Sequence, residues 1–175
     1  MTLRLRLQQM TEELPVEQHP GWVAALRTEF GHTVKTVDSE FPIGTYTCGV
    51  HSFYLINDPT YLDVASFGLG RTFAGAEFIY FLLDHGLIEE KLPAAATVGD
   101  LVLYFDGAAF KHVGRVTEGG QILSKWGLGY LYSHQLWEIP AGYGQTVRFF
   151  HGPPPEQGLD LFIVFAKFKG FRYEV

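Results

Sequence analysis

The residue best suited to covalent chemistry is Cys48, which is the only cysteine among the 175 residues. The sequence around it predicts a helix with Thr47 as N-cap and with Val50, Phe53 and Tyr54 on one face. Free N–H groups and the helix dipole at such a position favour the nucleophilic thiolate, so we expect a thiol pKa below the ~8.5 of a free cysteine. The alternative is that Cys48 is a small buried hydrophobic residue.

A base for this thiol is predicted at His112, close to the start of a strand. A strand holds an imidazole rigidly against the N-terminus of a packed helix, and a Cys–His pair is the general arrangement that activates a thiol. A lone histidine on a strand is more often a surface or core residue, so the pairing with Cys48 carries the interpretation. Cys48 and His51, three apart on a helix, offer a metal chelate as an alternative. No second ligand pair has matching spacing, so we expect no metal, with His51 beside Cys48 or lining the pocket.

The elements that must position these residues are helical first and strand-like afterwards. Alternation over residues 3–7 is typical of a short edge strand, and residues 22–30 predict a helix that Gly31 ends. The helix that carries Cys48 must end near Asp58-Pro59. The remaining predictions are a helix over 72–85 ended by Gly86, and strands over 101–105, 111–116, 121–124, 147–150 and 161–171.

Two polar or glycine-rich segments receive structural interpretations. Asp100 is expected to set the start of the strand at 101 by hydrogen bonding to a turn. Gly68-Leu69-Gly70 resembles part of a phosphate loop but has neither the P-loop lysine nor a preceding strand, so it is interpreted as a connector.

Three local motifs resemble the NlpC/P60 superfamily of papain-like cysteine peptidases and amidases. The first is a cysteine at the head of a helix, Cys48. The second is Val98-Gly99-Asp100-Leu101-Val102-Leu103-Tyr104, which is similar to the family's Pro-Gly-Asp-Leu-Val segment, and the third is His112-Val113-Gly114, which matches its His-Val-Gly strand. The segment Ser124-Lys125-Trp126-Gly127, followed by His134 and by Pro140 to Gly144, looks more like a divergent branch than like the murein hydrolases.

The resemblance implies an α+β, papain-like fold with N-terminal helices packed on an antiparallel β-meander. It makes Cys48 the nucleophile, His112 the base and Ser124, on the next strand, the residue that orients the imidazole. The family usually has His, Asn or Gln at that third position. It also has Asp-Cys-Ser-Gly where Thr47 and Gly49 flank Cys48 here.

The third catalytic position depends on strand register. A slip of one residue would present Lys125 or Leu123 to His112 instead of Ser124, and the third position would then be sought at Gln121 or His134. The substrate groove is expected to be lined by His51, Tyr46, His134 and Trp126.

The sequence therefore predicts a thiol hydrolase, either a peptidase or an amidase, that acts on a peptide or other amide-containing substrate without a cofactor. A thiol acyltransferase shares this chemistry. The alternative from another class is a binding module that keeps the fold without turnover.

Composition limits the partners and location. The chain is 47% hydrophobic, only 18% charged and has a formal net charge of −6, so nucleic acid is not an expected partner. No apolar stretch has the length of a membrane span or of a signal peptide h-region, so we expect no membrane association and a cytoplasmic location. We interpret 1–175 as one domain, with an N-terminal adapter (1–40), a catalytic-type core (41–152) and a C-terminal strand extension (153–175). Its oligomeric state is left open.

Overall fold

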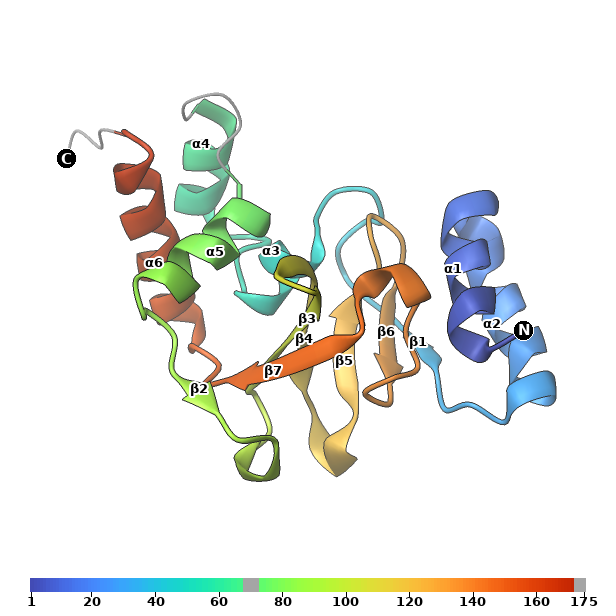
Figure 1. Ribbon diagram of the computed structural model, residues 1–175. Coiled ribbons are helices and arrows are strands. Elements are labelled where there is room, and N and C mark those ends of the chain that lie inside the picture. The colour runs from blue at the N-terminus through green and yellow to red at the C-terminus, as the bar shows by residue number, and fades with distance from the viewer. Residues whose placement is uncertain (68–72, 172–175) are drawn as a thin grey trace.

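An antiparallel sheet of seven strands forms the centre of the protein (Figure 1). The computed structural model describes residues 1–67 and 73–171. Along the sheet the strand order is β1-β6-β5-β4-β3-β7-β2, so β3 to β6 form an antiparallel meander. Its strands β3, β4 and β5 were predicted, whereas β6 was not, and the strand predicted over 147–150 is β7, which pairs with β3. The strands are β1 (Lys35–Val37), β2 (Glu90–Lys91), β3 (Leu101–Asp106), β4 (Ala109–Val116), β5 (Ile122–Lys125), β6 (Leu131–His134) and β7 (Thr146–Phe150).

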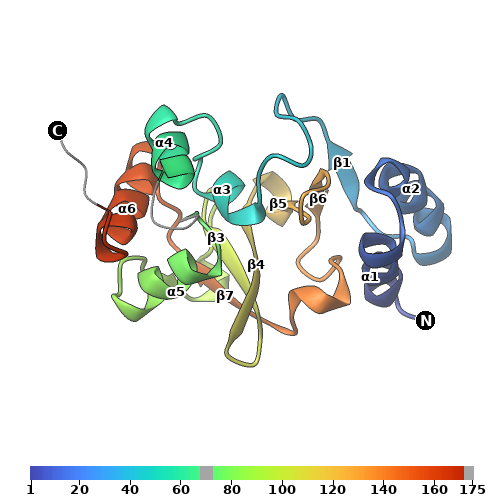
Figure 2. The same cartoon turned by 90° about the horizontal axis from the view of Figure 1, so that it is seen from above.

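Helices pack in two groups, and each group covers its own hydrophobic cluster (Figure 2). One group lies over the sheet face that contains Leu101, Leu103 and Val113, and the other lies beside β1 and β6 near Val102 and Tyr104. The first group is α3 (Cys48–Ser52), α4 (Pro59–Phe67), α5 (Ala76–Asp84) and α6 (Pro155–Phe168), and the second is α1 (Leu3–Glu13) and α2 (His19–Phe30). The mixed α+β class and the antiparallel meander are thus confirmed. No helix among the described residues is long and apolar enough to cross a membrane.

The strand predicted over residues 3–7 is wrong, because this segment belongs to α1. The Thr2 hydroxyl accepts a hydrogen bond from the Leu5 N–H and so caps the helix. Leu7 and Met10, three residues apart, are fully buried, whereas Leu5 is 51% exposed. The alternation of leucine and arginine concealed a helical period that becomes clear only with Met10.

The strand extension predicted over 161–171 is also wrong, because residues up to Phe168 form α6. Pro155 opens this helix at a position where its missing N–H costs nothing. The buried residues follow a helical period rather than a period of two; they are Leu161, Phe162, Phe165 and Ala166. A short apolar run does not by itself distinguish a buried helix from a buried strand.

The helix that begins at Cys48 is shorter than predicted. It ends at Ser52, and Tyr54 then adopts a left-handed backbone with φ of 59°. A new helix, α4, starts at Pro59, so the proline begins a helix rather than ending one. The predicted stop of α2 at Gly31 is confirmed by its left-handed conformation (φ 64°). The connector at Gly68-Leu69-Gly70 lies outside the described residues.

Candidate active site

Cys48 is the first residue of α3, as predicted; the residue as a whole is partly exposed, while its sulfur is surrounded by protein atoms. Thr47 adopts the extended N-cap conformation, but its buried hydroxyl makes no hydrogen bond. Gly49 allows the start of the helix to approach the chain before α5, because a Cβ at this position would lie 2.0 Å from the Ala74 carbonyl oxygen. The local sequence therefore fixes Cys48 by close backbone packing rather than by a side-chain cap.

The ionisation of Cys48 differs from the sequence prediction. Burial among the surrounding protein atoms raises the pKa of the thiol. Hydrogen bonds from the backbone of Val113 and Gly49 and the charge of Lys125 lower the pKa, but they do not overcome burial. The prediction of a thiol pKa below that of free cysteine is therefore wrong, and Cys48 is a neutral thiol at neutral pH.

The hydrogen bond from Val113 shows where the sulfur meets the sheet. β5 pairs with β4 at Arg115 and Val116, near the C-terminal end of β4. The Val116 N–H donates to the Asp100 carbonyl, on the side of β4 that faces β3. Successive backbone N–H groups of a strand point to alternate sides, so the Val113 N–H points to the side of β4 that faces β5. α3 packs against both β4 and β5. Cys48 thus lies at the edge of β4, where β4 and β5 diverge.

His112 precedes Val113 and points to the other face of the sheet. It lies opposite Tyr104 on β3, while Val113 packs in the cluster under α3 to α6. The imidazole is 1% exposed, and the Tyr143 ring stacks on it with ring centroids 4.2 Å apart. Burial lowers the pKa of His112 well below its usual value, and the nearby His134 lowers it further, so the ring is neutral. Its Nε2 is buried and has no hydrogen-bond partner, so it does not bond to the Cys48 sulfur.

Tyr143 interacts with both predicted catalytic residues. Its ring stacks on His112. It also lies near Cys48, because a negative charge on that sulfur adds to burial in raising the pKa of the Tyr143 phenol. Tyr143 lies at the end of a short 3₁₀-helix, Ala141–Tyr143. In the sequence, the segment Pro140 to Gly144 stood out only as part of the family resemblance, and Tyr143 received no role, because its place in the site depends on the packing of a loop against the sheet.

Ser124 is buried on β5 and is held by other partners than His112. Its hydroxyl lies 2.8 Å from the His134 Nε2 and accepts a hydrogen bond of 3.1 Å from the Trp126 Nε1. No hydrogen bond in the described part of the chain joins Ser124 to His112. Burial lowers the pKa of His134 to about 4. Trp126 and His134 are 3% and 0% exposed, so both belong to the interior of the site.

Lys125, which follows Ser124, points toward α3 as strand alternation requires. Its side chain is 0% exposed, and its Nζ lies 4.5 Å from the centroid of the Tyr46 ring while donating to the Gly129 carbonyl. No ion pair among the described residues includes it. Burial lowers the pKa of Lys125 to about 8, while the charge of Cys48 raises it. Lys125 thus places a buried positive charge near the thiol.

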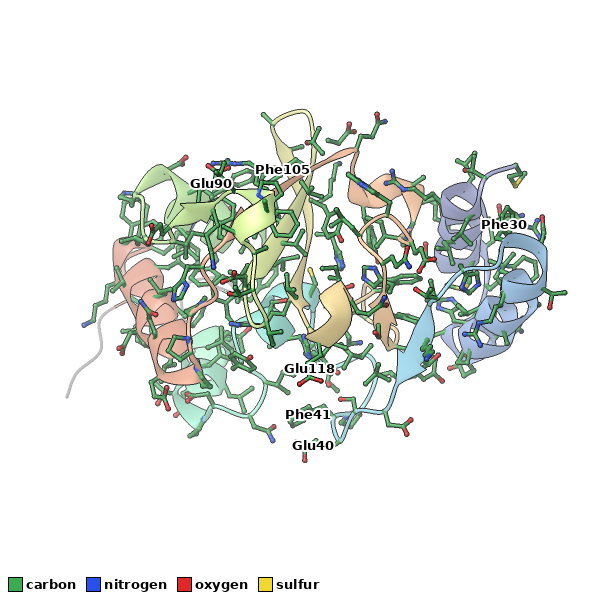
Figure 3. All side chains as sticks on the ribbon, turned by 90° about the horizontal axis from the view of Figure 1, so that it is seen from below. Phe30, Glu40, Phe41, Glu90, Phe105 and Glu118 are labelled. Atoms are coloured by element: carbon green, nitrogen blue, oxygen red, sulfur yellow. The ribbon has the colours of Figure 1, made fainter. Side chains whose placement is uncertain are left out.

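His51 and Tyr46 form a stacked pair of rings next to Lys125. The Tyr46 and His51 rings stack with centroids 6.2 Å apart. His51 borders a cavity of about 370 Å³, Tyr46 borders a second cavity of about 330 Å³, and Phe41 borders both. Phe41 is on the loop between β1 and α3, next to Glu40 (Figure 3). These two predicted substrate-binding residues therefore face hollow surfaces.

Arg115 connects the end of α3 to the sheet through hydrogen bonds. Its guanidinium donates to three carbonyl oxygens, those of Ser52 at 2.6 Å, Gly99 at 2.5 Å and Pro153 at 2.7 Å. The same group lies 4.2 Å from the Tyr54 ring centroid. The end of α3 is thereby held against β4 and the start of β3.

Asp100 has the structural role predicted for it. Its carboxylate accepts hydrogen bonds from the Thr97 N–H and hydroxyl and from Lys91, and the Gly152 N–H also donates to it. It thus closes the turn before β3. Gln121, the other alternative for the third catalytic position, accepts a hydrogen bond from the Thr33 hydroxyl.

Neither a metal centre nor a known relative accounts for this site. Among the described residues, no group of three or more His, Cys, Asp or Glu side chains has the geometry to hold a metal ion. Comparisons of the chain with protein-family models, curated proteins and solved structures gave no match.

Proposed function

We propose that the protein is a thiol hydrolase that cleaves an amide bond with Cys48 as nucleophile. The observation that carries this proposal is the environment of the sulfur: a partly exposed cysteine at a helix start, hydrogen-bonded by the Val113 and Gly49 backbone and close to the buried charge of Lys125. All three groups stabilise the thiolate more than the thiol. A sulfur that only filled space would gain nothing from them.

The proposed reaction begins from a neutral thiol and a neutral imidazole. Cys48 attacks the carbonyl carbon as its proton passes to His112, and the C–N bond then breaks with the proton returning to the leaving amine. Water hydrolyses the thioester and restores the thiol. The low pKa of buried His112 means that its ring is unprotonated at rest, and burial opposes the imidazolium that the transfer forms. The Tyr143 ring, stacked at 4.2 Å, stabilises this imidazolium while it exists. The Nε2 of His112 has no hydrogen-bond partner in the described part of the chain, and the proposed reaction requires the ring to turn from the Tyr104 side of the sheet toward the thiol.

Acylation by p-nitrophenyl acetate tests this function. Thiolate attack releases p-nitrophenolate and adds an acetyl group to Cys48, which mass spectrometry detects after rapid quenching. We expect a burst of p-nitrophenolate, a mass increase on the peptide that contains Cys48, and steady turnover afterwards. Cys48→Ala should show none of these, and His112→Gln should slow acylation while its circular dichroism stays native. Equal rates for the wild type and Cys48→Ala would refute the proposal.

A second set of variants tests the role of the buried cation. Lys125→Met should raise the midpoint of the pH profile for iodoacetamide alkylation of Cys48, whereas Lys125→Arg should keep it near that of the wild type. Both substitutions change the packing around Tyr46, so a shift shared by both variants would show that packing, rather than charge, controls the thiol.

A binding module without turnover is the second candidate. The raised pKa of Cys48 and the unbonded Nε2 of His112 favour it, because both describe a thiol that is not activated at rest. In that case alkylation would be slower than that of a free cysteine at every pH, and the acetylated thiol would not be hydrolysed.

A further inference from the structure

The N-terminal helix α1 lies beside the segment between β6 and β7 that contains the 3₁₀-helix Ala141–Tyr143 (Figure 1 and Figure 2). Arg4 of α1 reaches across to this segment with a partly buried guanidinium. It donates hydrogen bonds to three backbone carbonyl oxygens, those of Ile139 at 3.4 Å, Ala141 at 3.4 Å and Gly144. These acceptors lie before, within and after the 3₁₀-helix, so one side chain holds the whole turn.

Gln8, one helical turn after Arg4, makes a second link to the same segment. Its Oε1 accepts a hydrogen bond of 2.8 Å from the Gly142 N–H. A Cβ on Gly142 would lie 2.7 Å from this oxygen, so the glycine lets the turn approach α1 closely. The far end of the segment is held by the sheet, because the Gln145 N–H donates to the Phe105 carbonyl on β3 at 2.8 Å. The segment is therefore fixed between α1 and the sheet.

The segment carries Tyr143, whose ring stacks on the buried imidazole of His112 with centroids 4.2 Å apart and planes at 23°. A second ring, that of Tyr104, lies opposite His112 on β3 with centroids 5.7 Å apart. Arg4 reaches this ring as well, because its guanidinium lies 5.2 Å from the Trp137 ring centroid. Trp137 packs edge-on against Tyr104 with centroids 6.2 Å apart. Arg4 therefore acts on two aromatic rings beside the imidazole.

Attachment of α1 to the rest of the protein does not by itself account for Arg4. Leu7 and Met10 are fully buried and already pack α1 against the sheet. Burial lowers the pKa of the Arg4 guanidinium, which reflects a desolvation cost that attachment alone does not require. What Arg4 adds is a defined position for three carbonyl groups, and hence for Tyr143, which lies between two of them in the chain.

We propose that Arg4 is a positioning residue, which holds the segment that places the Tyr143 ring against His112. Its role in catalysis rests on the proposed function, in which His112 carries a proton during the reaction and the Tyr143 ring stabilises the imidazolium. The N-terminal segment, predicted only as an adapter, thereby contributes a residue to the site.

The NMR shifts of the His112 ring protons test the positioning role without requiring catalysis. A stacked aromatic ring shifts the protons of its neighbour upfield, so Tyr143→Leu defines the shifts of an unstacked imidazole. Arg4→Met should move the His112 signals most of the way from the wild-type shifts to those of Tyr143→Leu. Arg6→Met is the matched control, because Arg6 is on the same helix but lies over the Trp22 ring of α2, 5.0 Å from its centroid. This control should leave the His112 signals in place.

Gln8 gives a second pair of variants, which tests the link even where Arg4→Met loosens α1. Gln8→Met removes the acceptor for the Gly142 N–H and should shift the His112 signals in the same direction as Arg4→Met. Gln8→Glu keeps an acceptor and should leave them nearer to the wild type. Unchanged His112 signals in natively folded Arg4→Met or Gln8→Met, or an equal change in Arg6→Met, would overturn the proposal.

Acylation of Cys48 by p-nitrophenyl acetate connects this position to the reaction. Arg4→Met should slow acylation about two- to thirtyfold, which corresponds to the loss of one cation–π contact, while Arg6→Met should keep the wild-type rate. If the His112 signals depend on Arg4 but the ester does not acylate Cys48, the positioning of His112 stands and the hydrolase function is refuted. Acylation that is equally fast in Arg4→Met and in the wild type refutes the positioning role alone.

Discussion

Replacing Arg115 by Met should strongly destabilise the fold. The guanidinium is 6% exposed and donates to three carbonyl oxygens, and Met keeps most of the side-chain volume while removing every donor. Hydrogen bonds to a charged group contribute about 1.5–3 kcal/mol each, so three give a gross loss of about 4–9 kcal/mol. Relief of the desolvation of the buried cation offsets several kcal/mol of this. The net loss should be about 3–5 kcal/mol, a large part of the about 5–15 kcal/mol that stabilises a typical domain.

Urea denaturation of Arg115→Met gives this number, and Arg148→Met is the matched control. Arg148 pairs with Glu90 at 2.6 Å, but the two side chains are 45% and 50% exposed, so the pair should contribute less than about 1 kcal/mol. Arg115 also donates a hydrogen bond to the Ser52 carbonyl at the end of α3. In the variant, the alkylation rates of Cys48 in native buffer and in urea should therefore differ less than they do in the wild type. A loss for Arg115→Met no greater than that for Arg148→Met would refute the reasoning.

Three further substitutions test single contacts, each by urea denaturation. Burial alone would raise the pKa of Asp100, but its hydrogen bonds and ion pair hold the pKa below the usual value. The ionised Asp100 therefore stabilises the fold above the unfolded pKa of about 3.9, and this stabilisation is lost as pH falls through the lower folded pKa. Asp100→Asn should therefore have a smaller free energy of unfolding than the wild type at about pH 7. Its free energy of unfolding should also fall less steeply with pH below about pH 4. Ser124→Ala leaves the buried His134 Nε2 without its partner and should cost about 1–3 kcal/mol. Gly49→Ala places a Cβ 2.0 Å from a backbone oxygen and should cost about 1–3 kcal/mol, whereas Gly21→Ala, with no atom within 4 Å, should be neutral or stabilising.

Local signals in the sequence were sufficient for β3, β4 and β5 and for the start of α3, but not for β6. β3 and β4 read correctly because each is a long run bounded by turn residues, and Gly31 identified the end of α2 because its conformation there is left-handed. The start of α3 at Cys48 was likewise predictable from its flanking residues. In each of these cases the neighbouring residues in the sequence determine the backbone conformation, and distant contacts are not needed.

Long-range packing decided the features that the sequence did not predict. The apolar run from Leu161 is a helix because it packs against α4 and α5, and a run of that length is compatible with either type of element. The pKa of Cys48 was predicted in the wrong direction because helix position is a local property, whereas burial is a property of the whole fold. Arg115 gave no signal, since its three acceptors come from segments as far away in sequence as Ser52 and Pro153.

The buried charge of Lys125 acts on two side chains of α3, the Cys48 thiol and the His51 imidazole. An uncharged side chain would be less costly at a position with 0% exposure, since burying an ammonium without a carboxylate partner is unfavourable. The charge lowers the pKa of Cys48 and also lowers that of His51, and the Tyr46 ring contacts both the ammonium and the imidazole. One buried cation therefore favours a thiolate nucleophile and a neutral hydrogen-bond acceptor together. Removing its charge should disturb both, so Lys125→Met should slow alkylation of Cys48 at neutral pH and raise the pKa of His51, whereas Lys125→Arg should preserve both.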